Sequence, residues 1–234
     1  MKPLIVDNPF PTPINCRPFE FGADIVTHST TKYMDGHATS VGGVIVDSGN
    51  FDWTQNDKFP GLTTPDESYH GVVYTEQFGK AAYITKCTTL LNLGLETLHL
   101  RMPRHCSNAL AVAKFLKAHP KIESVRYPGL EGDEYYDLAQ KYMPNGTCGV
   151  ISLRIKGGRE DAVRFMDSLK LAAIVTHVAD SRTCCLHPAS TTHRQLTAQE
   201  LDDCGVYENL VRLSVGTENV DDIIADLDAA LANV

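Results

Sequence analysis

The stretch Asp24-Ile-Val-Thr-His-Ser-Thr-Thr-Lys32 decides the fold, because it joins a short apolar run to a lysine among small hydroxyl side chains. The apolar run is typical of a buried strand in an α/β sheet. Open α/β sheets place their ligand groups at the carboxyl ends of the strands. A lysine there, beside hydroxyls that can hold a phosphate, suits an imine with an aldehyde cofactor. Taken alone, Lys32 would instead be a solvated surface-loop lysine, the usual position of this residue type.

Asp7 lies 25 residues before Lys32 and ends a second predicted strand. The apolar run Leu4 to Val6 precedes it, and a loop rich in proline follows to Pro13. We expect Asp7 at the carboxyl end of its strand, in a low-dielectric site where it pairs with a protonated pyridine nitrogen. The alternative is an aspartate that caps the proline-rich turn.

Composition and charge exclude several classes of protein. The chain has 234 residues, of which 43% are hydrophobic, enough for one large or two small domains. Its net charge of −8 disfavours nucleic acid and anionic membrane surfaces as partners. There is no signal-peptide pattern and no apolar run near the roughly 20 residues of a membrane span, so we expect a soluble cytoplasmic protein. The seven irregularly spaced cysteines indicate free thiols in a reducing compartment.

The order of the apolar patterns predicts two regions around a long helical segment. Strand patterns of the first region lie at 4–6, 24–27 and 43–47. The segment 50–68 is interpreted as an irregular surface segment, and helical periodicity covers 76–119, interrupted at Pro103. Beyond this helix, strand and helix patterns alternate at 122–126, 134–142, 149–155, 159–168, 171–176, 182–186, 210–214 and 219–232.

Several short motifs spread over the chain share one resemblance. They are Val6-Asp-Asn8, Ser29-Thr-Thr-Lys-Tyr33 with Gly36-His37, Gly42-Gly43, Leu186-His-Pro-Ala-Ser-Thr-Thr-His193 and Val211-Arg-Leu-Ser-Val-Gly216. These motifs resemble the Cys/Met-metabolism family of pyridoxal-phosphate (PLP) enzymes, which have the fold type I architecture. Within that family, residues 176–180 and 187–195 look most like O-acetylhomoserine sulfhydrylases, also called O-acetylhomoserine aminocarboxypropyltransferases.

The resemblance implies an α/β fold, of which this chain would form the C-terminal part. A partial PLP-binding large domain would cover residues 1–88, a long connecting helical segment 89–119, and a smaller α+β C-terminal domain 120–234. Family members carry a large portion before the Val-Asp-Asn strand, and close relatives carry an additional stretch between the equivalents of residues 84–86 and 90–92. We therefore expect an open sheet edge, and with it a homo-oligomer or an isolated chain of poor stability.

The resemblance also implies roles for residues of the first region. Lys32 would hold PLP as an imine and then move protons, and Asp7 matches the partner of the pyridinium nitrogen. Ser29 and Thr31 match hydroxyls that bind the cofactor phosphate, and we expect them on the same side of an extended turn. Local turn capping is the alternative for these two hydroxyls.

Two residues of the second region match substrate-binding positions. Arg212 lies between apolar neighbours, where a buried guanidinium needs an anion, and it matches the arginine that grips the substrate carboxylate. His177 stands where many relatives carry a serine or asparagine that assists this contact, and a packed core histidine is the equal alternative. His187 and His193 lack zinc-site spacing with Cys184-Cys185, so no metal is expected, and thiol chemistry at these cysteines would need electropositive surroundings.

The implied reaction is γ-replacement in sulfur amino-acid metabolism, with PLP as the cofactor. O-Acetyl-L-homoserine would react with sulfide or a thiol to give homocysteine or methionine. Cystathionine γ-synthase and methionine γ-lyase chemistry remain open, because pocket shape separates these reactions. A function of a different class is a truncated, inactive fragment that acts only by association with another chain.

Overall fold

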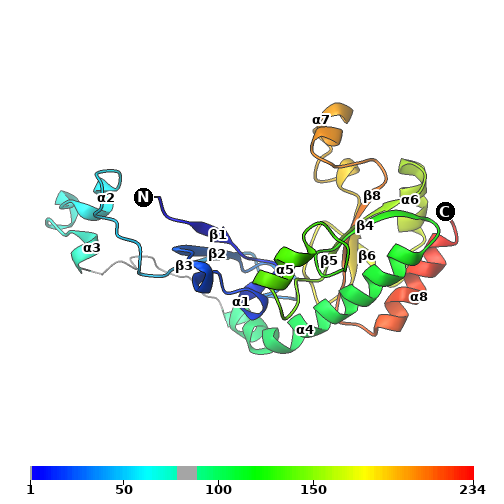
Figure 1. Cartoon of the computed structure of the whole chain (residues 1–234), viewed down its shortest axis with the longest axis horizontal. Coiled ribbons are helices and arrows are strands. Elements are labelled where there is room, and N and C mark those ends of the chain that lie inside the picture. Colours follow the sequence, from blue (N-terminus) through cyan, green and yellow to red (C-terminus); the bar gives the residue numbers. More distant parts are fainter. Residues whose placement is uncertain (1, 78–88) are drawn as a thin grey trace.

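The computed structural model describes residues 2–77 and 89–234, which form two β-sheets joined by the long helix α4 (Figure 1). The strands are β1 (Ile5–Asp7), β2 (Ile25–Ser29), β3 (Gly43–Asp47), β4 (Ile122–Arg126), β5 (Val150–Ile155), β6 (Ala173–Ile174), β7 (Cys184–Leu186) and β8 (Leu210–Ser214). The α-helices are α1 (Thr12–Asn15), α2 (Pro60–Thr63), α3 (Tyr74–Gln77), α4 (Thr89–Ala118), α5 (Tyr136–Tyr142), α6 (Arg159–Asp167), α7 (Ala198–Asp203) and α8 (Val220–Leu231).

The first sheet has the order β1-β2-β3, with β1 parallel and β3 antiparallel to β2. Ile25 and Val26 of the central strand are 5% and 2% exposed, whereas Ile5 and Ile45 of the outer strands are 57% and 44% exposed. Since β1 and β2 are parallel, their carboxyl ends lie at the same edge of the sheet. This edge leads directly into residues 30–42, which we call the lysine loop.

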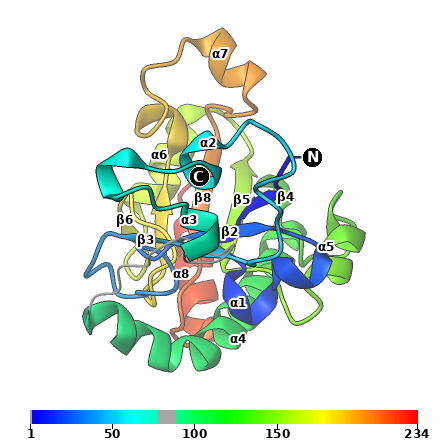
Figure 2. The same cartoon turned by 90° about the vertical axis from the view of Figure 1, so that its left-hand side faces the viewer.

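The segment 50–68 is not simply a surface segment, so that prediction is wrong at its aromatic residues. Phe51 and Trp53 are 4% and 5% exposed and form a small core with Ile25, and Phe59 lies edge-on to both rings. Burial of these large rings outweighs the polar composition around them. Helices α2 and α3 follow, at the end of the molecule farthest from the second sheet (Figure 1, Figure 2).

Helix α4 is continuous through Pro103, so the predicted interruption at this residue is wrong. Pro103 lacks the N–H that would donate a hydrogen bond to the carbonyl of His99. Because His99 is exposed, a water molecule can donate to that carbonyl instead. Leu98 and Met102 are buried and hold the helix on both sides of the break in the hydrogen-bond pattern.

The second sheet has the order β4-β5-β8-β7-β6, antiparallel except for the pair β6 and β7. Alternation along its central strands sends Ile151, Leu153 and Leu213 into the main core, where each is at most 1% exposed. Helices α4, α6 and α8 pack on this face (Figure 1). Arg212 and Ser214 therefore project from the opposite face.

Most predicted elements of the second region are confirmed, with shifts of a few residues at their ends. The pattern at 171–176 shortens to the two residues of β6, and the start predicted near Glu76 belongs to the separate helix α3. The shortening predicted between 84 and 92 falls mainly on residues outside the described ranges.

Candidate active site

Lys32 lies in a tightly folded loop that directly follows β2. Its N–H donates to the carbonyl of Ser29 (3.2 Å), and its carbonyl accepts from the N–H of Gly36 (2.8 Å). The expectation that this turn is extended is wrong, because these local backbone hydrogen bonds fold the loop into tight turns. The placement of Ser29 and Thr31 on one side stays a prediction.

Asp7 and Ser29 lie on one face at the carboxyl edge of the first sheet. Asp7 pairs with Thr27 in the parallel register, and the Thr27 hydroxyl donates to Asp7 Oδ1 (2.8 Å). Ser29 is two residues further along β2, so its side chain is on the same face. Asp7 is exposed, because β1 is an outer strand of the sheet that the described residues form. The prediction that this carboxylate lies in a low-dielectric site is therefore wrong for this part of the chain.

The Thr31 hydroxyl is engaged inside the lysine loop. It accepts from the N–H of Gly42 (3.0 Å) and donates to the carbonyl of the same residue (3.3 Å). This is the turn-capping arrangement considered as the alternative. To bind a phosphate, the Thr31 hydroxyl would have to give up its 3.3 Å hydrogen bond to the Gly42 carbonyl and donate to a phosphate oxygen instead. The phosphate-binding role of Thr31 therefore stays a prediction.

Lys32 shares its surroundings with two groups of the second region. Burial, and next the positive charge of Arg212, lower the pKa of the Lys32 amine. Burial also lowers the pKa of His177. The negative charge of Asp180 raises this pKa in part, and the positive charge of Lys32 lowers it further. A lysine with a lowered pKa has a larger fraction of neutral amine, the form that attacks an aldehyde. Arg212 contacts the His177 carbonyl, and the charges of Lys32 and these two residues act on one another.

Arg212 has no carboxylate partner within the described residues. Its Nη2 donates to the carbonyls of Thr176 and His177 (3.0 Å each), while its buried Nε has no hydrogen-bond partner in residues 2–77 and 89–234. Burial lowers the pKa of Arg212, opposed by the thiols of Cys184 and Cys185. Arg212 is half-buried, so the complete burial expected from its apolar neighbours is wrong. A guanidinium with a buried, unpaired N–H and no counter-ion among the described residues is suited to an anionic ligand.

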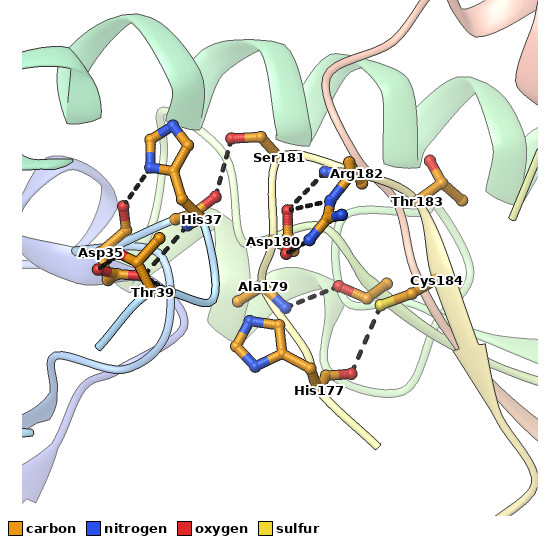
Figure 3. A network of polar contacts seen from close by, with 12 residues as sticks. Asp35, His37, Thr39, His177, Ala179, Asp180, Ser181, Arg182, Thr183 and Cys184 are labelled. Carbon is orange, nitrogen blue, oxygen red and sulfur yellow. Dashed lines mark hydrogen bonds and ion pairs between the residues drawn. The ribbon is translucent and has the colours of Figure 1, made fainter. Parts of the chain in front are cut away.

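His177 also has a buried ring nitrogen, Nε2, with no partner in the part of the chain that the structure describes. Its carbonyl accepts from Cys184 Sγ (3.4 Å), and its imidazole extends beside Ala179 (Figure 3). The residue is only half-buried, and the charge of Lys32 contributes to the lowered pKa of its imidazole, so both a ligand contact and core packing remain open for it.

The thiol and zinc alternatives are not supported by the geometry. Cys184 and Cys185 are 3% and 1% exposed, and burial raises the pKa of both thiols, that of Cys185 to about 12. A buried, protonated thiol is a poor nucleophile. The ring nitrogens of His187 contact the Ser190 hydroxyl (2.8 Å) and the Glu208 carbonyl (2.7 Å), so this histidine is structural.

Known proteins are similar to this chain in sequence and in fold. The model of the family described as "Cys/Met metabolism PLP-dependent enzyme" matches residues 2–232. The chain belongs to this family. The O-acetyl-L-homoserine sulfhydrylase of Leptospira meyeri is 46% identical over 99% of this chain, and the homocysteine synthase of Schizosaccharomyces pombe is 48% identical over 98%. A crystal structure described as an O-acetylhomoserine (thiol)-lyase of Campylobacter jejuni covers 97% of the chain with 36% identity and a TM-score of 0.87, and it contains N'-pyridoxyl-lysine-5'-monophosphate.

This Cys/Met-metabolism chain spans 58% of the length of each of these relatives. Its alignment with the Leptospira sulfhydrylase runs over 257 positions, more than the 234 residues of the chain. That relative therefore has residues inside the aligned region that this chain lacks.

The described side chains fit the chemistry of PLP, the cofactor of the family. Lys32 offers an amine of lowered pKa for the aldehyde, and Asp7 and Ser29 offer a carboxylate and a hydroxyl at the same sheet edge. Arg212 Nε and His177 Nε2 have no hydrogen-bond partner among the described residues, so both nitrogens could donate to a ligand.

Three residues that hold the lysine loop escaped the sequence analysis: Asp35, Arg101 and Ser181. Arg101 is 8% exposed in α4 and leaves no room for a Cβ on Gly36. A charged residue on the buried stripe of a helix was the signal that could have revealed it. Asp35 and Ser181 lie in loops, where no periodic pattern marks a buried polar contact.

Proposed function

We propose that this chain carries the reaction residues of a PLP-dependent γ-replacement enzyme. Its substrates are O-acetyl-L-homoserine and sulfide or a thiol, and its products are homocysteine or methionine together with acetate, which leaves from Cγ. The observation that carries the proposal is an amine of lowered pKa near a half-buried guanidinium whose buried Nε–H is unpaired among the described residues. These two groups match the two ends of an amino-acid substrate, and the names of the similar proteins support the choice of substrate.

PLP, when bound, supplies an electron sink for negative charge that develops on the substrate carbon. Lys32 would hold the cofactor through its Nζ. Once the substrate amine takes its place on the cofactor, the freed Lys32 amine would take and return protons at Cα and Cβ of the substrate. Asp7 keeps a proton on the ring nitrogen, and the hydroxyls of Ser29 and Thr31 orient the phosphate.

Arg212 donates to the substrate carboxylate through its unpaired Nε–H. Because Nη2 is already held by two carbonyls, the plane of the guanidinium is set before the substrate arrives. His177 adds a second donor through Nε2. Both contacts are charge-assisted hydrogen bonds to the same carboxylate.

We further propose a cytoplasmic homo-oligomer, with the division into residues 1–88, 89–119 and 120–234 expected from the sequence. The open edges of the first sheet and the net charge of −8 support this proposal. Among the described residues, no helix is long and apolar enough to cross a membrane.

The test is the visible absorbance of the purified chain mixed with PLP. We expect bound absorbance for the wild type and for Lys170→Ala, which removes an exposed lysine, and its loss in Lys32→Ala. Homocysteine formation from O-acetyl-L-homoserine and sulfide should fall about 1,000-fold in Lys32→Ala. A wild-type chain that stays colourless and unmodified at Lys32 would contradict the proposal and favour an inactive fragment. Cystathionine formation, or thiol release from methionine, would assign one of the related reactions instead.

A further inference from the structure

The segment 176–183 connects the strand of Arg212 with the lysine loop. At one end, the carbonyls of Thr176 and His177 accept from Arg212 Nη2 (3.0 Å each). Nearer the other end, Ser181 reaches the lysine loop, where its N–H (2.8 Å) and its hydroxyl (2.9 Å) both donate to the carbonyl of Gly36. Figure 3 shows Ser181 beside the backbone next to His37.

The same segment is tied firmly to the end of β8. The N–H of Ala179 donates to the Ser214 hydroxyl (2.8 Å), and the N–H and hydroxyl of Thr183 donate to the carboxylate of Glu218 (2.6 and 2.9 Å). The Ser181 carbonyl in turn accepts from the N–H of Thr217 (2.8 Å). Ser181 thus lies on a segment that is hydrogen-bonded to the end of β8, and its two donors bind the lysine loop of the first region.

The acceptor of these bonds is itself held in place. Gly36 has a φ of +74°, a left-handed conformation that other residues rarely adopt, and its N–H donates to the Lys32 carbonyl (2.8 Å). A shift at Ser181 is therefore transmitted to Lys32 through one short hydrogen-bonded turn.

We propose that Ser181 is a positioning residue that sets the span between Lys32 and Arg212. This inference rests on the proposed function, in which the substrate must reach both groups at once. An amino acid has a fixed distance between its nitrogen and its carboxylate, so the span decides whether both ends bind in the reactive arrangement. The hydroxyl of Ser181 restricts that span by adding a second hydrogen bond to the one made by its N–H.

The test uses the titration of Lys32 in the chain without PLP, followed by NMR of methyl-labelled lysines. Arg212 is one of the two groups that lower the pKa of Lys32, after burial. We expect Ser181→Ala to raise this pKa and Ser181→Thr, which keeps the hydroxyl, to leave it near the wild-type value. Ser168→Ala is the matched control, because the Ser168 hydroxyl also donates to a backbone carbonyl (2.8 Å) but at the end of α6.

A double-mutant cycle with Arg212→Gln separates positioning from general loosening. If Ser181 sets the span, Arg212→Gln shifts the Lys32 titration less in the Ser181→Ala background than in the wild type. An unchanged Lys32 titration in folded Ser181→Ala, or strictly additive shifts, would overturn the proposal. Thr217→Val, which removes the hydroxyl bond to the Ser181 carbonyl (3.1 Å), gives the same comparison if Ser181→Ala does not fold.

Kinetics give a second measurement that depends on the proposed function. We expect Ser181→Ala to raise KM for O-acetyl-L-homoserine by about 3- to 10-fold, with kcat within about twofold of the wild type. A wild-type chain without turnover would refute the proposed function, while the Lys32 titration would still decide the role of Ser181.

Discussion

Asp35 holds the lysine loop in shape through its charge. It is 1% exposed and accepts from the N–H and hydroxyl of Thr39 (2.9 and 2.7 Å), the Ser40 hydroxyl (2.8 Å) and the His37 N–H (3.2 Å). Burial by itself would raise the pKa of Asp35, but these donors outweigh it and lower the pKa from 3.8 to about 2. The conformation around Lys32 therefore depends on one ionised carboxylate.

We predict that Asp35→Asn lowers the free energy of unfolding by about 2 kcal/mol at neutral pH. A folded-state pKa below the unfolded one stabilises the protein above the unfolded value, and this stabilisation is lost as the pH falls through the folded value. The difference between wild type and variant should be constant above about pH 4 and shrink as the pH falls towards 2. Urea denaturation over this range measures it, with the exposed Asp202→Asn as control. A difference that does not change with pH would show that shape, rather than charge, explains the effect.

Elements with a local apolar pattern could be predicted from the sequence, and those that depend on distant contacts could not. Strand β5 alternates regularly, and helix α8 is preceded by Asn219, whose side chain accepts from the N–H of Asp221 (3.0 Å) as an N-cap. The burial of Trp53 and the passage of α4 through Pro103 depend on packing against other elements, which no local pattern records.

The site shows the same division. Asp7, Lys32 and Arg212 stand in strand or strand-end motifs that are visible in the sequence. Ser181 contacts Gly36 across 145 positions, which no local pattern predicts. The exposure of Asp7 was also unpredictable, because an apolar run looks the same in an outer strand as in a covered one.

Helix α4 touches the lysine loop at Gly94 so closely that no side chain fits. A Cβ there would lie 2.6 Å from the carbonyl oxygen of Asp35 and closer still to that of Met34. Alanine normally stabilises a helix by about 1 kcal/mol relative to glycine. We predict that Gly94→Ala instead destabilises the protein by about 1–3 kcal/mol, because the backbone of the lysine loop must move aside. Thermal unfolding measures this, with Ser107→Ala on the exposed face of α4 as control, and a raised Tm would contradict the close packing.

The whole molecule is organised around α4, which belongs to two hydrophobic cores. Its first half packs Leu98 and Met102 against Tyr33 of the lysine loop, and its second half packs Val112 and Leu116 against the second sheet. The two halves of the candidate site are thus joined both by a rigid helix and by the segment that contains Ser181.

The first sheet has outer strands that no other described strand covers. Within the described residues both outer strands, β1 and β3, have an unpaired edge, and the face that carries Asp7 also exposes Ile5 and Ile45. Unpaired edges with apolar side chains favour association between chains. We predict that the isolated chain self-associates, with a sedimentation mass above that of the monomer that rises with concentration.

A charge on the open edge should oppose this association, because a buried lysine cannot be solvated in a paired sheet. Ile5→Lys should therefore lower the sedimentation mass, whereas Val163→Lys, at an exposed position of α6 that is 43% accessible, should not. Both variants place the same charge on the surface, so a difference between them locates the contact at β1. A wild-type chain that sediments as a monomer at every concentration and melts cooperatively would show that the sheet needs no partner.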